Sequence, residues 1–223
     1  MRIIPKMVFS GTVQFAGFAL LIFLPAGTLN YWQAWVFLTV SLSTWIPGFY
    51  LLAKNPGALE RRMRGGPAAE TRAVQKLVMA AIWLSLVAGI VLSALDHRFG
   101  WSHVPDAVCV LGNLVVAAGL SVATLVLIQN NYAAATVRVE PGQQVVSTGL
   151  YRLVRHPMYT GNVILMVGVP LALGSYWGLV FVIPVLIVLT LRIRDEEKLL
   201  RLELAGYDEY TRKVRYRLLP HMW

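Results

Sequence analysis

The stretch MYTGNVILMVGVPLALGSYWGLVFVIPVLIVLTL, residues 158–191, contains no charged residue and decides the fold. At about 1.5 Å per residue, a single helix of this length would far exceed the ~30 Å hydrocarbon core of a bilayer. Gly168, Pro170 and Gly174 lie near the middle of the stretch. We therefore expect two short helices, at about residues 159–173 and 176–191, joined as a tight hairpin.

Four further apolar stretches precede this hairpin, at about residues 8–25, 32–52, 74–95 and 107–128. Each is close to the roughly 20 residues that a membrane-spanning helix needs. Only 14% of the chain is charged, against about 25% in soluble domains. The sequence predicts an all-α integral membrane protein of about six transmembrane helices, followed by cytoplasmic C-terminal helices. We expect a four-helix transmembrane region (residues 1–128) and a second region (residues 129–223).

Basic residues are distributed unevenly over the expected loops. With alternating helices, nineteen of the twenty Lys and Arg residues fall on one side of the membrane, and only Arg98 falls on the other. The positive-inside rule then places both termini in the cytoplasm. The net charge of +9 alone would suggest nucleic acid. A membrane protein has no soluble face to carry that charge, so we expect the chain to lie in a bilayer and not to bind nucleic acid. We infer no obligate protein partner.

Two groups of polar residues flank the hairpin. Arg155 and His156 precede Pro157, which suits the first turn of a helix, and the free amides of a helix start favour an anion. The second helix is followed by Arg192, Arg194, Asp195, Glu196 and Glu197, so the hairpin brings this group beside Tyr159. A basic and an acidic cluster are thus expected to meet at one membrane-surface site. Taken singly, the groups also fit an interfacial anchor and weak surface ion pairs.

Other chemistries fit the sequence poorly. It has neither a dinucleotide-binding glycine motif after a strand nor a phosphate-binding loop. The histidines are scattered, so we expect no metal site. The single cysteine, Cys109, lies in an apolar run and suits a buried position.

The segment Arg155-His156-Pro157-Met158-Tyr159-Thr160-Gly161 resembles the Arg-His-Pro-x-Tyr-x-Gly motif of the isoprenylcysteine carboxyl methyltransferase family and its phospholipid methyltransferase relatives. The resemblance extends upstream through residues 145–151. It resumes with Arg192, the pair Glu196-Glu197, and residues 207–210 and 214–220. It covers about residues 130–223, whereas the N-terminal helices resemble the family only in hydropathy.

The resemblance implies a cytoplasm-facing pocket for S-adenosylmethionine, covered by the C-terminal helices, with a lateral opening for the tail of a lipid or prenylated acceptor. Residues 129–223 would then be the methyl-donor-binding catalytic region. Carried over by position, the donor-binding residues are Gln143, Gln144, Val145, Val146, Tyr151, His156, Pro157, Met158, Tyr159 and Glu196. The catalytic residues are Arg192, Tyr159 and His156, and the acceptor-binding residues are Arg192 and Arg155. A donor ammonium and sulfonium would suit the carboxylate of Glu196.

Two departures concern the acceptor more than the donor. A tryptophan common in the family is replaced by Leu165, and a histidine of many eukaryotic members is matched by Gln143. The predicted activity is transfer of a methyl group to a lipid-like acceptor, with the carboxylate of an isoprenylcysteine as one candidate. Two alternatives stay open: an NADPH-dependent membrane reductase of the sterol reductase type, and a non-catalytic lipid-binding membrane protein.

Overall fold

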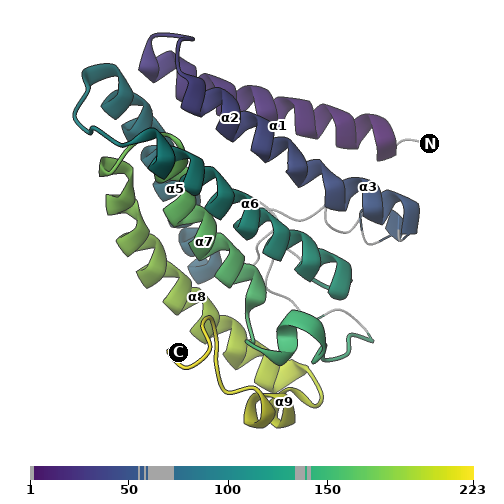
Figure 1. Cartoon of the computed structure of the whole chain (residues 1–223). Helices are drawn as coiled ribbons and strands as arrows, with labels where there is room; N and C mark the ends of the chain where they lie inside the picture. Colours follow the sequence, from purple (N-terminus) through teal and green to yellow (C-terminus); the bar gives the residue numbers. More distant parts are fainter. Residues whose placement is uncertain (1–2, 55, 58, 60–72, 134–138, 140–141) are drawn as a thin grey trace.

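The computed structural model describes residues 3–54, 56–57, 59, 73–133, 139 and 142–223, and the regular elements within them are helices (Figure 1). The α-helices are α1 (Ile3–Ala26), α2 (Trp32–Ser41), α3 (Trp45–Lys54), α5 (Ala73–Phe99), α6 (Asp106–Gln129), α7 (Pro157–Ala172), α8 (Val182–Glu203) and α9 (Tyr207–Lys213). Short 3-10 turns are η1 (Leu42–Thr44), η3 (Gly149–Arg152) and η4 (Trp177–Phe181).

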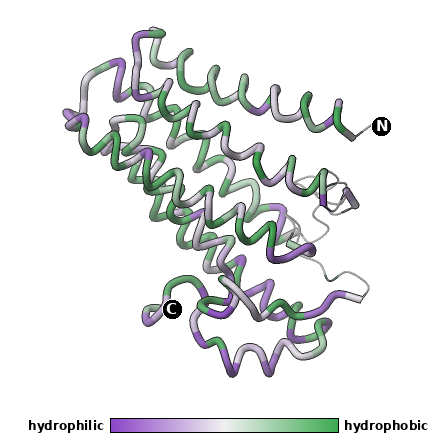
Figure 2. Tube along the Cα trace, turned by 45° about the vertical axis from the view of Figure 1, so that its right-hand side comes forward, coloured by the Kyte–Doolittle hydropathy of each residue, from purple (hydrophilic) through white to green (hydrophobic). Residues whose placement is uncertain are grey.

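Within the described residues, five helical stretches are long and apolar enough to cross a membrane: Ile4–Ala26, Trp32–Lys54, Val74–Phe99, Asp106–Gln129 and Trp177–Glu203. The sixth apolar helix, α7, is shorter. Figure 2 shows apolar colour along these helices and a more hydrophilic region around α9. The expected all-α, multi-pass membrane fold is confirmed.

The second helix of the hairpin is longer than expected. After η4, α8 continues to Glu203 instead of ending near residue 191. Residues 192–203 contain neither Gly nor Pro, so nothing in the sequence breaks the helix there. The residues from Arg192 to Glu197 therefore lie on the hairpin helix itself. A separate C-terminal helix, α9, begins after Gly206, whose φ of 81° favours glycine.

The helices α6 and α7 form the most extensive helix pair of the molecule. Glycines allow their backbones to approach: a Cβ atom on Gly168 would lie 2.9 Å from the Val116 nitrogen, and one on Gly161 would lie 3.1 Å from the Gly119 oxygen. Small residues serve this purpose in membrane helix packing. The expected division at residue 128, which stays a prediction, falls at the end of α6, so the tightest packing joins the two regions.

Polar contacts hold together the end of the bundle at which α5 ends and the hairpin turns, which we call the far end. The Asp96 carboxylate accepts hydrogen bonds from the Ser102 amide at 2.6 Å, the Ser102 hydroxyl at 2.7 Å and the Ser175 hydroxyl. Tyr31 donates to the Leu173 carbonyl and stacks on His97, with ring centroids 3.7 Å apart. The hairpin turn is thereby tied to α5 and to the start of α2.

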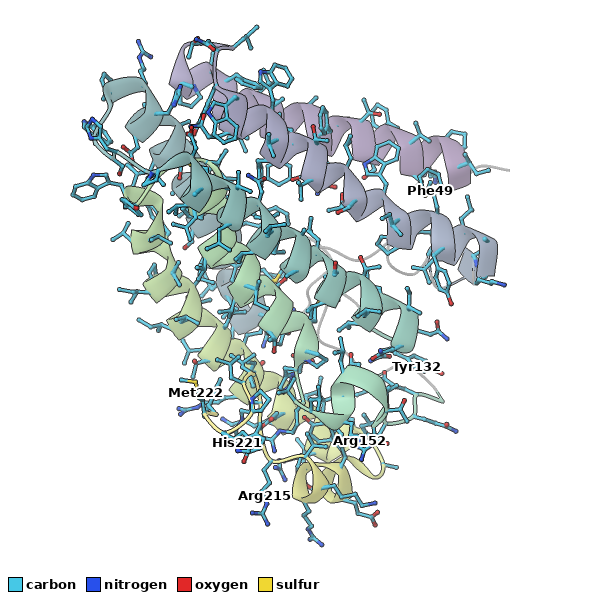
Figure 3. All side chains as sticks on the ribbon, viewed as in Figure 1. Phe49, Tyr132, Arg152, Arg215, His221 and Met222 are labelled. Atoms are coloured by element: carbon cyan, nitrogen blue, oxygen red, sulfur yellow. The ribbon has the colours of Figure 1, made fainter. Side chains whose placement is uncertain are left out.

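The opposite end, where α6 ends and α7 begins beside α9, is called the site end below. In both Figures 1 and 2, α1 and the α2–α3 pair diverge from α6–α8 away from the far end. Figure 3 shows Arg152 and Arg215 at the site end together with Tyr132, whereas Phe49 lies on α3. Several basic residues used in the topology prediction lie outside the described residues: Arg2, Arg61, Arg62, Arg64, Arg72 and Arg138.

Candidate functional site

The start of α7 is clamped by the end of the chain. The backbone amides of Arg155 and His156 donate hydrogen bonds of 2.9 Å to the carbonyls of Tyr216 and Arg217. One turn into α7, the Thr160 hydroxyl donates to the Leu218 carbonyl at 2.7 Å. We call residues 214–223 the C-terminal strap. These bonds fix the residues that precede α7, so their side chains are presented to α8 in one orientation.

The buried carboxylate of Glu197 joins α7, α8 and the strap. Its Oε1 atom lies 2.7 Å from Arg155 Nε, an ion pair without hydrogen-bond alignment, and 3.3 Å from His156 Nε2. Its Oε2 atom accepts a hydrogen bond of 3.0 Å from Arg217 Nε. An anion was predicted at the start of α7, and the chain itself supplies one in Glu197. The sequence did not indicate which of the two adjacent glutamates would turn inward.

A second polar group is centred on the Tyr159 hydroxyl. Tyr159 donates to Glu196 Oε2 at 2.6 Å and accepts from Arg192 Nε at 2.8 Å. His156 Nδ1 lies 4.0 Å from the same Glu196 oxygen. Tyr159, His156 and Arg192, the three predicted catalytic residues, are therefore brought together, and Tyr159 and His156 both approach the Glu196 carboxylate.

A cavity of about 120 Å³ opens at the site end, above the start of α7. We call it the polar cavity. All ten predicted donor-binding residues line it: Gln143, Gln144, Val145, Val146, Tyr151, His156, Pro157, Met158, Tyr159 and Glu196. The structure thus gathers residues from the 143–151 segment, α7 and α8 around one space. What occupies that space stays a prediction.

The polar cavity also has walls that the sequence prediction omitted, chiefly from α9. Tyr210 donates to the Tyr151 carbonyl at 2.7 Å and so fixes α9 against η3. The buried Tyr207 hydroxyl has no hydrogen-bond partner among the described residues. Burial, followed by the nearby Glu197 and Glu196 carboxylates, raises the pKa of Tyr207 above its ordinary value. Tyr207 and Tyr210 lie in a segment that the family resemblance covers, and this was the sequence feature that could have indicated the wall.

A larger cavity of about 520 Å³ lies between the helices and is mostly apolar. We call it the apolar cavity. Its walls come from α1, α2, η1, α3, α5, α6, α7 and α8, so it occupies the region where the helices diverge in Figure 1. Arg192 is the charged side chain among the described residues that line it. Arg155, the other predicted acceptor-binding residue, lines the polar cavity and faces Glu197.

The two cavities share a wall. Ala133, Met158 and Tyr159 line both of them. An apolar molecule held between the helices and a polar molecule held at the site end would therefore meet at the first turn of α7. The Tyr159 hydroxyl, fixed between Arg192 and Glu196, stands at that junction.

The region that carries this site is similar in sequence to known proteins. Delta(14)-sterol reductase TM7SF2 of Mus musculus is 29% identical over 91 residues, which are 40% of this chain. The chain spans only 22% of the length of that relative. Residues 107–203, from the start of α6 to the end of α8, match the family model described as phospholipid methyltransferase, so the three residues of the shared wall lie within the matched region.

Proposed function

We propose that this multi-pass membrane protein is an S-adenosylmethionine-dependent methyltransferase acting on a lipid-like acceptor. The observation that carries the proposal is the wall shared by a polar and an apolar cavity at Tyr159. The match of residues 107–203 to the phospholipid methyltransferase family supports the reaction class. In this proposal the site end faces the cytoplasm, as do both termini, because basic residues such as Arg152 and Arg215 gather there.

The polar cavity suits a cationic donor. Five tyrosines line it: Tyr132, Tyr151, Tyr159, Tyr207 and Tyr210. Aromatic faces attract sulfonium and ammonium groups in the way they attract other organic cations. Glu196 adds a carboxylate, and the Tyr207 hydroxyl offers a hydrogen bond that the described residues leave unused. These residues fit S-adenosylmethionine, which would supply an electrophilic methyl group bound to sulfur.

The apolar cavity suits the tail of a membrane-derived acceptor, and Arg192 suits an acidic end group. As a finer proposal, the acceptor is a carboxylate such as that of an isoprenylcysteine. A lone pair of the carboxylate oxygen would form the O–CH₃ bond while the S–CH₃ bond breaks, and its electron pair would remain on a neutral thioether. No proton moves in this step, so no general base is needed.

The chain's own residues would act by positioning. Arg192 would hold the acceptor carboxylate where the two cavities meet. Tyr159, held by its hydrogen bond to Glu196, would fix the position of the wall that the cavities share. Alignment of the reacting atoms can supply a large part of a rate enhancement. The Glu197 cluster would hold Arg155 and His156, which line the polar cavity, in place.

The similarity to the mouse sterol reductase favours a second candidate, an NADPH-dependent membrane reductase.

The decisive experiment is calorimetric titration of S-adenosylhomocysteine, with NADPH as the comparison ligand, into the detergent-purified protein. We expect micromolar binding of S-adenosylhomocysteine. Glu196→Gln should weaken it about tenfold or more, since a charged contact is lost. The exposed Glu203→Gln on the same helix is the matched control. Binding of NADPH alone would replace the proposal by the reductase, and binding of neither would favour a non-catalytic lipid-binding protein.

A further inference from the structure

A buried glutamine at the start of α5 contacts the candidate site from outside the region that matches the family. Gln75 is fully buried at the third position of α5, and both ends of its amide are used. Its Oε1 atom accepts a hydrogen bond of 2.6 Å from Arg192 Nη1. Its Nε2 atom donates to Asp195 Oδ2. A glutamine that is satisfied in both directions is held in one orientation.

These bonds extend the network at the shared wall. Gln75 holds Arg192 Nη1, while Arg192 Nε donates to the Tyr159 hydroxyl at 2.8 Å. Tyr159 in turn donates to Glu196. The guanidinium is planar and carries its donors in a fixed fork, so two acceptors at different nitrogens determine its plane. Without Gln75, the Arg192 guanidinium would lose the acceptor at Nη1 that helps to determine its plane.

The choice of an amide also matters chemically. A glutamate at position 75 could accept the same bond, but it would neutralise the charge of Arg192 and repel Asp195. Glutamine orients the guanidinium while leaving its positive charge available to an anion in the apolar cavity, which Arg192 lines. We propose that Gln75 is a positioning residue that aims Arg192 at the shared wall and thereby sets the preference for an acidic acceptor. The acceptor role of Arg192 in this inference rests on the proposed function.

The test measures binding, so that it does not depend on turnover. The probes are N-acetyl-S-farnesylcysteine and its uncharged methyl ester, titrated separately into the purified full chain. The parent should bind the acid about tenfold more tightly than the ester, in line with a hydrogen-bonded charged contact. Gln75→Met, which keeps the volume but removes both hydrogen bonds, should bring this ratio close to one. Gln75→Glu should also lower the ratio, because the glutamate would neutralise the charge of Arg192.

Two controls separate positioning from packing. Gln33→Met changes a half-buried glutamine near the far end and should leave the acid-to-ester ratio unchanged. In an Arg192→Met background, Gln75→Met should have no further effect on the ratio, because interacting residues are non-additive. A ratio that Gln75→Met leaves at the parent value, or an undiminished effect in the Arg192→Met background, would overturn the proposal.

Titration with S-adenosylhomocysteine distinguishes this inference from the proposed function. Gln75 does not line the polar cavity, so Gln75→Met should leave donor-product affinity within about twofold of the parent. Absence of S-adenosylhomocysteine binding in the parent would refute the methyltransferase. A ratio that still depends on Gln75 would then support its positioning of Arg192 independently.

Discussion

Loss of the Glu197 charge is predicted to destabilise the site end strongly. It is 4% exposed and faces Arg155, His156 and Arg217. Glu197→Gln keeps the shape of the side chain and removes its charge. The Arg217 side chain is 29% exposed, so water can replace much of that contact, and its loss should cost at most about 1 kcal/mol.

Arg155 has no such access to water, since it is only 8% exposed. Removing one partner of a buried ion pair costs about 3–5 kcal/mol, because the other charge stays buried without compensation. Arg155 therefore dominates the expected effect. For a chain of this size the loss corresponds to a fall of roughly 10 °C in the melting temperature. Arg155 and His156, which line the polar cavity, would also lose their shared contact, which should weaken binding of S-adenosylhomocysteine there.

The assay is thermal unfolding in detergent, followed by calorimetry with S-adenosylhomocysteine well below the melting temperature. Glu203→Gln, an exposed change on the same helix, should melt with the parent. The double variant Arg155→Met/Glu197→Gln removes both buried charges and should recover part of the lost stability. A melting temperature of Glu197→Gln within about 2 °C of the parent, a shift worth less than about 1 kcal/mol, would refute this account of the cluster.

Three further results are expected. Tyr207→Phe should leave the melting temperature unchanged, because the hydroxyl has no partner among the described residues, but should weaken S-adenosylhomocysteine binding severalfold by calorimetry. Gly168→Val should cost about 1–3 kcal/mol in thermal unfolding, because its Cβ would lie 2.9 Å from the Val116 nitrogen; a parent-like melting temperature would contradict the close approach. Above pH 10, stability should fall: burial raises the pKa of both Tyr207 and Tyr210, so the fold keeps protons that the unfolded chain loses, and the part of the phenolate absorbance that comes from these two tyrosines should appear only on unfolding.

The hairpin could be predicted because its signals are local. An uncharged run too long for one helix, with Gly174 near its middle, specifies a turn, and Gly174 adopts a φ of 70° there. The boundary at residue 191, between the hairpin and the expected C-terminal helices, was wrong, since a change from apolar to charged residues marks the membrane surface and does not end a helix. A helix ends where caps or breakers occur, and here these are at residues 204–206.

The candidate site was predictable to the extent that its residues lie in segments covered by the family resemblance. The ten proposed donor residues come from three segments that the resemblance already connected. Glu197 and Gln75 could not be assigned in this way. Adjacent helical residues differ by about 100° in direction, so only packing decides whether Glu196 or Glu197 turns inward. Gln75 meets Arg192 across 117 positions of sequence, and no periodic pattern encodes such a contact.

The two cavities are built by different parts of the chain. The polar cavity is built after residue 129, largely from segments within or next to the region similar to the phospholipid methyltransferase family. The apolar cavity takes much of its wall from α1, α2, α3 and α5, which lie outside that region. Residues such as Phe18, Trp45 and Met79 can therefore change the shape of the acceptor space without touching the polar cavity. If the proposed function holds, acceptor choice should diverge among similar proteins through these N-terminal helices, while Gln75 ties α5 to Arg192, which lines the apolar cavity.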